Sequence, residues 1–290
     1  MTQVYLPRTL TELWSYLDVE PEAQVYAGGT DLLVKMRNHW LSTAPALICM
    51  ERLGELQEVR EIGDGILIGA TVTHTELLRH PLIFFYLPVL VQALQTLGSP
   101  LIRNMGTIGG NICTASPAGD TLPPLYILQA EVELRSHDTF RILPIREFIT
   151  GPGETQLQKG EIMTGIRLKK PERYNVHHFE KIGQRKSMAC AVASMAAMLR
   201  LSPDGIIEAA RLAWGSVGPT IVTDAALEDT LIGKKLSRGT LTDAMQRIRQ
   251  IVTPIDDVRA SADYRRTVSG NLLLRLLDAQ PQNYAKLSEE

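Results

Sequence analysis

Two glycine-rich segments hold the residues best suited to binding a charged ligand. The first reads Ala-Gly-Gly-Thr-Asp-Leu over residues 27–32, and the second runs from Thr107 to Asp120 and contains Gly109 and Gly110. Adjacent glycines can take positive φ and let a ligand approach the backbone closely. Successive backbone N–H groups can then converge into a nest for an anion. Two such loops, each with a threonine and an aspartate, suit a ligand that carries two phosphates and a ribose.

The glycine pairs can also be interpreted as structural turns that bind no ligand. A Gly-Gly pair between apolar runs is more often a tight turn than a phosphate cradle. For one copy alone the turn is the better interpretation. Because the same side-chain types occur in two copies, the sequence favours a nucleotide site.

Other chemistries find little support in the sequence. It contains neither a Gly-Lys-Ser/Thr phosphate loop nor the dinucleotide fingerprint with three spaced glycines. Cys49, Cys113 and Cys190 are too far apart to form an iron–sulfur or zinc ligand pair, and the histidines suggest no cluster, so we expect no metal site. The basic run at 184–187 is either a solvated turn or a source of positive charge near an anionic ligand. We assign no catalytic residue.

The composition is that of an ordinary folded protein. The chain has 290 residues, of which 44% are hydrophobic and 21% charged, and its net charge is −2. We expect two or three domains, and no general affinity for nucleic acid or an anionic membrane. No apolar run approaches the roughly 20 residues that span a bilayer, and the N-terminus lacks the features of a signal peptide. Cysteines without a pairing pattern indicate a reducing compartment, so we expect a cytoplasmic protein.

The elements around the two loops can be predicted from periodicity. A short strand at 23–27 runs into the first loop. A helix that begins near Thr30 would direct its N-terminal amides at a ligand over that loop. The other elements predicted in this part of the chain are a helix at 87–97, a short buried helix at 122–128 and an alternating strand at 130–136.

The polar stretch 169–173 is the predicted domain boundary. Beyond it, apolar runs predict strands at 179–182, 189–201 and 206–215. The Ala-rich middle run could also be a buried helix. Amphipathic periodicity predicts helices at 223–232, 240–251 and 260–277. This part of the chain is therefore α+β, a sheet with helices on one face.

Two motifs closely resemble the FAD-binding loops of the molybdenum hydroxylase flavoproteins. They are the segment 27–32 and the run Arg-Asn-Met-Gly-Thr-Ile-Gly-Gly-Asn at 103–111. This family comprises the medium subunits of xanthine dehydrogenase, nicotinate dehydrogenase and aerobic carbon monoxide dehydrogenase. The run 114–120 is similar to the xanthine dehydrogenase version, and the segments 181–189 and 262–266 resemble the family's C-terminal domain. The resemblance covers essentially the whole chain.

The resemblance implies an α+β fold. Two α/β subdomains would form an FAD-binding fold of the vanillyl-alcohol-oxidase type. A mixed α/β cap would follow, like the C-terminal domain of the carbon monoxide dehydrogenase flavoprotein. The implied boundaries are 1–172 for the FAD-binding domain, with subdomains near 1–55 and 56–172, and 173–290 for the cap.

The resemblance also implies a set of residues that bind FAD. Those that would hold the pyrophosphate are Ala27, Gly28, Gly29, Thr30, Asp31, Leu32, Thr107, Ile108, Gly109, Gly110 and Asn111. Those at the ribityl or phosphate region are Asp120, Thr114 and Ser116, and those along the isoalloxazine or the adenine are Leu97 and Met163. The cap residues near the ring and the acceptor site are Lys181, Arg185 and the stretch Ser187-Met188. Xanthine-oxidising members often carry an acidic residue where this chain has Met188, and this departure bears on the choice of electron acceptor.

The implied activity is electron transfer. Reducing equivalents would leave a substrate at a molybdenum cofactor on a large partner chain, cross iron–sulfur centres on a small partner, reach FAD here and pass to NAD or another acceptor. The assembly would be a heterotrimer that dimerises, and its substrate (a purine, nicotinate, an aldehyde or carbon monoxide) stays open. A flavin carries its own redox chemistry, which agrees with the scarcity of candidate acids and bases. The alternatives are a subunit of nicotinate or carbon monoxide dehydrogenase, a stand-alone FAD oxidoreductase, and a nucleotide-binding module without redox activity.

Overall fold

The computed structural model describes residues 2–40, 44–170, 174–185 and 188–279. The chain divides into two compact units that interleave along the sequence. The first unit comprises Met1–Phe84, Gly98–Ala115 and Gln129–Lys170, and the second comprises Phe85–Leu97, Ser116–Leu128 and Pro171–Glu290. A single cut near residue 172 would separate the segments 85–97 and 116–128 from the unit with which they pack. Residues 171–173 of the predicted boundary stretch lie outside the described residues.

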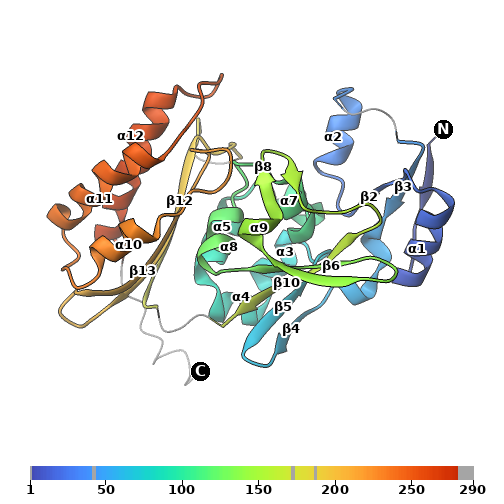
Figure 1. Ribbon diagram of the computed structural model, residues 1–290, viewed down its shortest axis with the longest axis horizontal. Helices are drawn as coiled ribbons and strands as arrows, with labels where there is room; N and C mark the ends of the chain where they lie inside the picture. Colours follow the sequence, from blue (N-terminus) through green and yellow to red (C-terminus); the bar gives the residue numbers. More distant parts are fainter. Residues whose placement is uncertain (1, 41–43, 171–173, 186–187, 280–290) are drawn as a thin grey trace. The chain divides into compact units, whose positions relative to one another are not determined.

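The first unit begins with a parallel three-stranded sheet in the order β1-β3-β2, of which β2 and β3 are labelled in Figure 1. Its strands are β1 (Gln3–Tyr5), β3 (Ala46–Cys49) and β2 (Gln24–Tyr26). Helix α1 (Leu10–Val19) begins after Thr9, whose hydroxyl accepts a hydrogen bond from the third residue beyond it and so caps the helix. Leu13 and Trp14 of this helix pack with Ile48 and Ile162 in one core, which joins this sheet to the next one.

The first unit also contains an antiparallel five-stranded sheet in the order β4-β5-β10-β6-β7. The strands are β4 (Val59–Ile62), β5 (Gly65–Gly69), β10 (Ile162–Lys169), β6 (Glu131–Arg135) and β7 (Phe140–Pro144), so the predicted strand at 130–136 is confirmed. The register between β10 and β6 shifts between Met163 and Gly165, as at a bulge, which redirects the side chains at that end of β10. A short hairpin of β8 (Ile149–Gly151) and β9 (Glu154–Thr155) precedes β10.

Short helices connect these strands. They are α2 (Leu32–Arg37), α3 (His74–Arg79), α4 (Pro81–Tyr86), α6 (Pro100–Met105), α7 (Ile108–Thr114) and α9 (Ile145–Phe148), with 3-10 turns η1 (Met50–Arg52) and η2 (Gly54–Leu56). The expectation of a loop from Thr107 to Asp120 is wrong for the first part of that segment, because Ile108–Thr114 folds as α7. Thr107 caps the helix, and Ile108 and Ile112 bury one face of it, so the paired glycines lie in its first turn.

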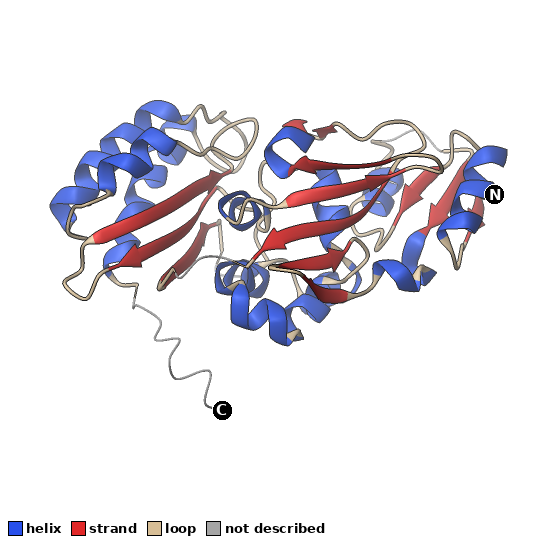
Figure 2. Ribbon diagram, turned by 60° about the horizontal axis from the view of Figure 1, so that its bottom comes forward, coloured by secondary structure: helices blue, strands red, loops and turns tan. Residues whose placement is uncertain are grey.

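The second unit is built on the antiparallel sheet β11-β12-β13. Its strands are β11 (Val176–Ile182), β12 (Ala193–Leu201) and β13 (Ile207–Gly215), which confirms the three predicted strands. The helices α10 (Ala225–Leu231), α11 (Arg238–Ile251) and α12 (Ala262–Leu272), followed by the 3-10 turn η3 (Leu273–Leu277), cover one face of this sheet (Figures 1 and 2). The predicted sheet with helices on one face is therefore present.

Two helices from earlier in the chain cover the opposite face of the same sheet. They are α5 (Pro88–Thr96) and α8 (Leu122–Ile127), predicted at 87–97 and 122–128. The side chain of Gln92 accepts the backbone amide of Phe179 over 2.7 Å and donates to the carbonyl of His177 over 3.0 Å, so it pairs with the edge strand β11. Because β12 is buried on both faces, small residues fill it, which explains why its Ala-rich run also fits a helix.

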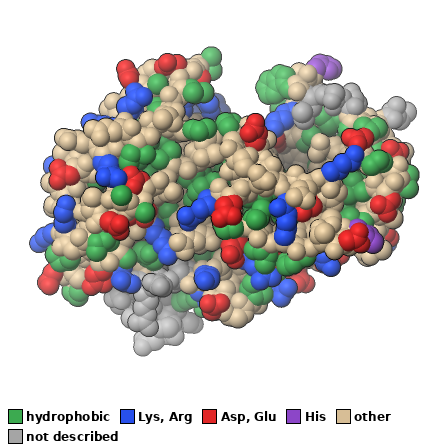
Figure 3. Space-filling model, in the orientation of Figure 1, with side chains coloured by type: hydrophobic (Ala, Val, Ile, Leu, Met, Phe, Trp, Pro, Cys, Tyr) green, Lys and Arg blue, Asp and Glu red, His purple; other side chains and the backbone are tan. Residues whose placement is uncertain are grey.

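The surface of the molecule carries mixed charge. On the face drawn in Figure 3, acidic and basic side chains are interspersed, without a broad area of one sign. Such a face attracts polyanions only weakly. No helix in the described part of the chain is long and apolar enough to cross a membrane.

Candidate cofactor site

The first glycine loop joins β2 to α2 and leaves its backbone donors free. Gly29 has φ +68°, a left-handed conformation that favours glycine. A Cβ at Gly28 would lie 1.7 Å from the carbonyl oxygen of Met105, so no side chain fits there. Among the described residues, no acceptor pairs with the backbone amides of residues 28–32. A run of consecutive free amides is the arrangement that binds an anion.

The second loop, in contrast, uses its amides within the fold. The amides of Ile108 and Gly109 donate to backbone carbonyl groups in the segment 70–72, each over 3.0 Å. The amide of Gly110 donates to the hydroxyl of Thr107 over 3.1 Å. These amides are not available as a second nest. The glycines here allow α7 to pack against the segment 70–72, where a Cβ at Gly109 would lie 2.6 Å from a carbonyl oxygen.

The two loops lie side by side, as the sequence predicts. A Cβ at Gly106 would be 3.4 Å from the hydroxyl of Thr30. The carboxylate of Asp31 accepts a hydrogen bond over 3.3 Å from the hydroxyl of Thr114, which stands 83 residues further along the chain. Asp31 also pairs with Lys35 at 2.6 Å. The Asp31 carboxylate therefore ties the first loop to α7.

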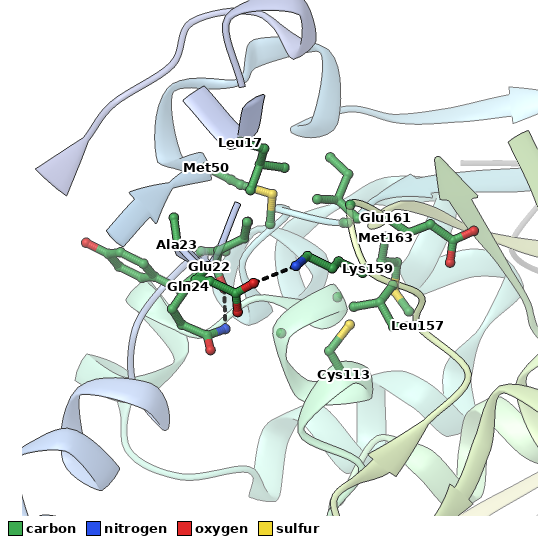
Figure 4. Close-up of a pocket in the computed structure, with 18 of the residues that line it drawn as sticks. Leu17, Glu22, Ala23, Gln24, Met50, Cys113, Leu157, Lys159, Glu161 and Met163 are labelled. Carbon is green, nitrogen blue, oxygen red and sulfur yellow. Dashed lines mark hydrogen bonds and ion pairs between the residues drawn. The ribbon is translucent and has the colours of Figure 1, made fainter. Parts of the chain in front are cut away.

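A cavity of about 460 Å³ opens beside the two loops (Figure 4). Its walls come from the ends of β2 and β10, from α7 and from the segment before β10. The predicted residues that line it are Ala27, Gly109, Gly110 and Met163. Sites for small ligands typically measure about 300–1,000 Å³, so this cavity is large enough for part of a dinucleotide.

The residues of the loop and the cavity fit a dinucleotide such as FAD. The free amides of residues 28–32 can offset the charge of a diphosphate. The adjoining cavity is lined by apolar side chains and bare backbone and also by charged side chains such as Glu22 and Lys159. Cys113 lines the cavity, and burial raises the pKa of its thiol to about 12, so it stays protonated and uncharged. The wall at Cys113 is therefore uncharged.

In the second unit, the predicted residues Asp120 and Lys181 form a buried ion pair. Lys181 Nζ lies 2.5 Å from Asp120 Oδ2, with 8% and 9% of the two side chains exposed, and Nζ also donates to the carbonyl of Thr96 over 2.9 Å. Burial raises the pKa of Asp120 to about 6, against the lowering effect of the ammonium group. Asp120 Oδ1 is buried without a partner among the described residues, so it can accept a hydrogen bond from a ligand.

The other predicted residues of the second unit have local partners or core positions. Ser116 accepts a backbone hydrogen bond over 3.3 Å in its own turn, and Leu97 is a core residue at the end of α5. Arg185 donates to the carbonyl of Met188, which has φ +52° and an exposed side chain. Ser187 lies outside the described residues. The role of these residues at the flavin ring stays a prediction.

Sequence reasoning missed part of the cavity wall. Tyr26 directly precedes the first loop, and Cys113 follows Gly109 by one helical turn, so a helical interpretation of 107–114 would have found it. The segment 156–161 carries no motif. It reaches the cavity only because distant strands of the five-stranded sheet come together. No short stretch of sequence indicates that pairing.

The fold and the site together define an α+β protein that binds a dinucleotide. Residues 1–171 match the family described as the FAD binding domain in molybdopterin dehydrogenase, and residues 178–280 match the CO dehydrogenase flavoprotein C-terminal domain. The chain belongs to the FAD-binding subunits of the molybdenum hydroxylases. The resemblance inferred from the two glycine motifs is confirmed, and so is FAD as the cofactor.

Relatives and solved structures agree with this assignment. The nicotinate dehydrogenase FAD-subunit of Eubacterium barkeri is 31% identical over 271 residues, which cover 91% of this chain and 90% of that protein. The xanthine dehydrogenase FAD-binding subunit of Escherichia coli O157:H7 is 32% identical over 260 residues, which cover 89% and 88%. A chain of quinoline 2-oxidoreductase from Pseudomonas putida 86 has a TM-score of 0.91 at 25% identity, and covers 96% of both chains. A chain of carbon monoxide dehydrogenase from Hydrogenophaga pseudoflava has a TM-score of 0.89 at 28% identity, with the same coverage. The expected fold is confirmed, and the chain is a subunit of an FAD-dependent oxidoreductase.

Proposed function

We propose that this chain carries electrons, through its FAD, within a molybdenum-containing hydroxylase of the xanthine dehydrogenase type. One observation supports the binding of FAD. The free backbone amides at residues 28–32 adjoin a cavity that is large enough for the adenosine half of the cofactor. Bound FAD supplies the redox chemistry. The chain itself binds and orients the cofactor and sets the charge around it.

Each part of the first unit has a separate task in this function. The amides of residues 28–32 hold the diphosphate, and Asp31 keeps that loop against α7 through its hydrogen bond with Thr114. Gly109 and Gly110 keep the nearby wall free of side chains, so the ligand can approach the backbone. Met163 is buried and gives the cavity an apolar side that excludes water.

The second unit supplies charge and polar acceptors. Lys181 and Arg185 are the cations that the family resemblance assigns to the flavin ring. A fixed positive charge stabilises a developing anion in its surroundings. The free Oδ1 of Asp120 is our candidate acceptor for a ribityl hydroxyl.

The proposed partners are a small iron–sulfur subunit and a large molybdopterin subunit, in a heterotrimer that dimerises. Electrons would arrive from the iron–sulfur subunit and leave to NAD or another acceptor. A relative from Hydrogenophaga pseudoflava, 28% identical over 278 residues, bears the name carbon monoxide dehydrogenase medium chain, which supports membership of a multi-chain enzyme. A purine or nicotinate is the substrate class we favour for the whole enzyme. The free cysteines at 49, 113 and 190 agree with a cytoplasmic location.

The flavin content of the purified chain and of Gly110→Val tests this function. Gly110 lines the cavity, so a valine there would occupy space that the ligand needs. We expect wild-type protein to release FAD on denaturation, and the variant to contain almost none. Gly54→Val is the matched control, because a Cβ at Gly54 meets nothing within 4 Å. Wild-type protein without flavin would refute the proposed function, and stoichiometric FAD in Gly110→Val would refute the placement of the cofactor.

Reduction and turnover separate the remaining alternatives. Reduction of the bound flavin by NADH or light is expected of an electron carrier, and a flavin that resists both would indicate a nucleotide-binding module. Turnover of substrate by the isolated chain would indicate a stand-alone oxidoreductase. Co-purification of two further chains is the result expected for a molybdenum hydroxylase subunit.

A further inference from the structure

The segment 156–161, which precedes β10, is fixed at its base by Arg141 of β7. The guanidinium donates from Nε and Nη2 to the two carboxylate oxygens of Glu161, each over 2.8 Å, and from Nη2 to the carbonyl of Gln156. The same carboxylate accepts the backbone amide of Gln158 over 2.8 Å, and only 3% of the Glu161 side chain is exposed. A bidentate arginine–carboxylate pair holds a fixed geometry. The base of this segment is therefore rigid.

The tip of the same segment reaches across the cavity. Leu157, Lys159 and Gly160 line the cavity, and so does Glu22 in the turn before β2. Figure 4 shows Lys159 and Glu22 pointing toward one another from opposite sides, and their Nζ and Oε1 atoms lie 2.5 Å apart. Each of these two side chains is 70% exposed. An exposed pair of this kind is weak and sensitive to salt.

The backbone turns at Gly160, between Lys159 and the anchored Glu161. Gly160 has φ +79°, and a Cβ there would meet nothing within 4 Å. Glu161 holds the amide of Gln158 through its carboxylate and the carbonyl of Gln158 through its own amide, so the backbone of this turn is fixed. The part that can move is the exposed side chain of Lys159, which can rotate away from Glu22.

We propose that residues 157–160 form a latch that retains the cofactor in its cavity. The ion pair between Lys159 and Glu22 closes the latch, and the pair between Arg141 and Glu161 anchors it. The ligand held behind it is the adenosine half of FAD, so this role rests on the proposed function. Arg141, Lys159 and Glu22 act as positioning residues. Because the closing pair is weak, the latch opens often enough to admit the cofactor and slows its escape.

The rate of FAD release from the full chain, in the assembly in which it is purified, tests the latch. The rate is followed by the flavin absorbance that passes an ultrafiltration membrane after dilution. Lys159→Ala removes the closing pair, and we expect release to become about 1.5- to 5-fold faster at low salt. The ratio between variant and wild type should fall toward one between about 0.1 and about 1 M salt, where the screening length drops from about 10 to about 3 Å. The exchanged pair Lys159→Glu with Glu22→Lys should restore slow release.

Lys170→Ala is the matched control for this experiment. Lys170 also forms an ion pair within the first unit, at 2.9 Å from Glu61, and does not line the cavity, so its loss should leave release unchanged. Equal release from Lys159→Ala and wild type, or an exchanged pair that releases FAD as fast as Lys159→Ala, would overturn the latch and leave FAD binding intact. Wild-type chain that holds no FAD would overturn the proposed function instead.

Discussion

At the scale of single residues, Asp120 gives the second unit a pH-dependent stability. Its pKa is about 6 in the folded chain and 3.8 in the absence of the fold, because burial disfavours the charged carboxylate. Between these values the folded chain binds a proton that the unfolded chain has released. The free energy of unfolding contributed by Asp120 therefore falls as the pH rises from about 4 to about 6, by about 3 kcal/mol in all.

Asp120→Asn isolates this effect, because asparagine does not titrate. We expect the wild type to lose about 3 kcal/mol relative to the variant as the pH rises through that window. Urea unfolding of the apoprotein at a series of pH values measures the difference. Subtracting the free energy of unfolding of the variant from that of the wild type at each pH also cancels the contributions of other acidic groups. One of these is Glu161, whose pKa is lowered beside Arg141. A difference that stays constant from pH 4 to 7 would contradict the raised pKa of Asp120.

The residues of the glycine loops could be predicted from the sequence, whereas those of the latch could not. Paired glycines occur where the backbone needs a positive φ or a close approach to another group. Because this requirement is local, a short stretch of sequence can reveal it. Lys159 and Glu22 stand 137 residues apart and are ordinary exposed charges. Only the folded arrangement of β2 and β10 brings them together.

At the scale of elements, α7 depends on its N-cap. Thr107 is a buried residue, and its hydroxyl accepts a hydrogen bond from the amide of Gly110 over 3.1 Å. Thr107→Ala leaves that amide without its acceptor, and we expect the free energy of unfolding to fall by about 1 kcal/mol. Thr107→Ser keeps the hydroxyl and should retain most of the stability. Urea unfolding of the two variants provides the comparison, and equal losses would show that the methyl group of Thr107 matters and the cap does not.

Elements with a strong period could be predicted, whereas helix α7 could not. The C-terminal helices α10, α11 and α12 each bury one face, and the strand at 130–136 alternates apolar and charged residues, so each shows a repeat in the sequence. In α7, the adjacent glycines disfavour a helix by intrinsic propensity. Packing against the segment 70–72 and the cap at Thr107 override that preference. Helix α3, in contrast, has a sequence signal at its N-terminus, a capping box formed by Thr73 and Glu76.

At the scale of the whole molecule, the interleaving of the two units could not be predicted from the sequence. Helices α5 and α8 were expected at the right places, yet their partner is a sheet that begins at Val176. The contacts that assign them there are long-range, such as the hydrogen bond from Arg211 to the carbonyl of Ile127, 84 residues away. A short stretch of sequence does not indicate which distant element a helix packs against. The sequence therefore predicted a single cut at residue 172.

A fragment of residues 174–290 tests whether the chain folds as two interleaved units or as two domains divided at residue 172. Without α5 and α8, the face of the sheet that holds Ala196 and Met198 would be open to water, and β11 would lose the pairing supplied by Gln92. An open apolar face and an unprotected edge strand favour loose packing and association. We expect this fragment to bind a hydrophobic dye strongly, to lack the near-ultraviolet circular dichroism of the buried Trp214, and to unfold in urea without a sharp transition.

The matched control is a fusion that returns the segments 85–97 and 116–128 to the fragment through flexible linkers. It restores the two helices that complete the core of the second unit, so we expect a cooperative urea transition, a fixed Trp214 signal and little dye binding. A fragment of 174–290 that already unfolds as cooperatively as the fusion would mean that the helices of one face, packed through buried residues such as Leu212 and Ile248, suffice to fold the sheet. In that case the cut at residue 172 would mark a true folding boundary, and α5 and α8 would be dispensable additions to it.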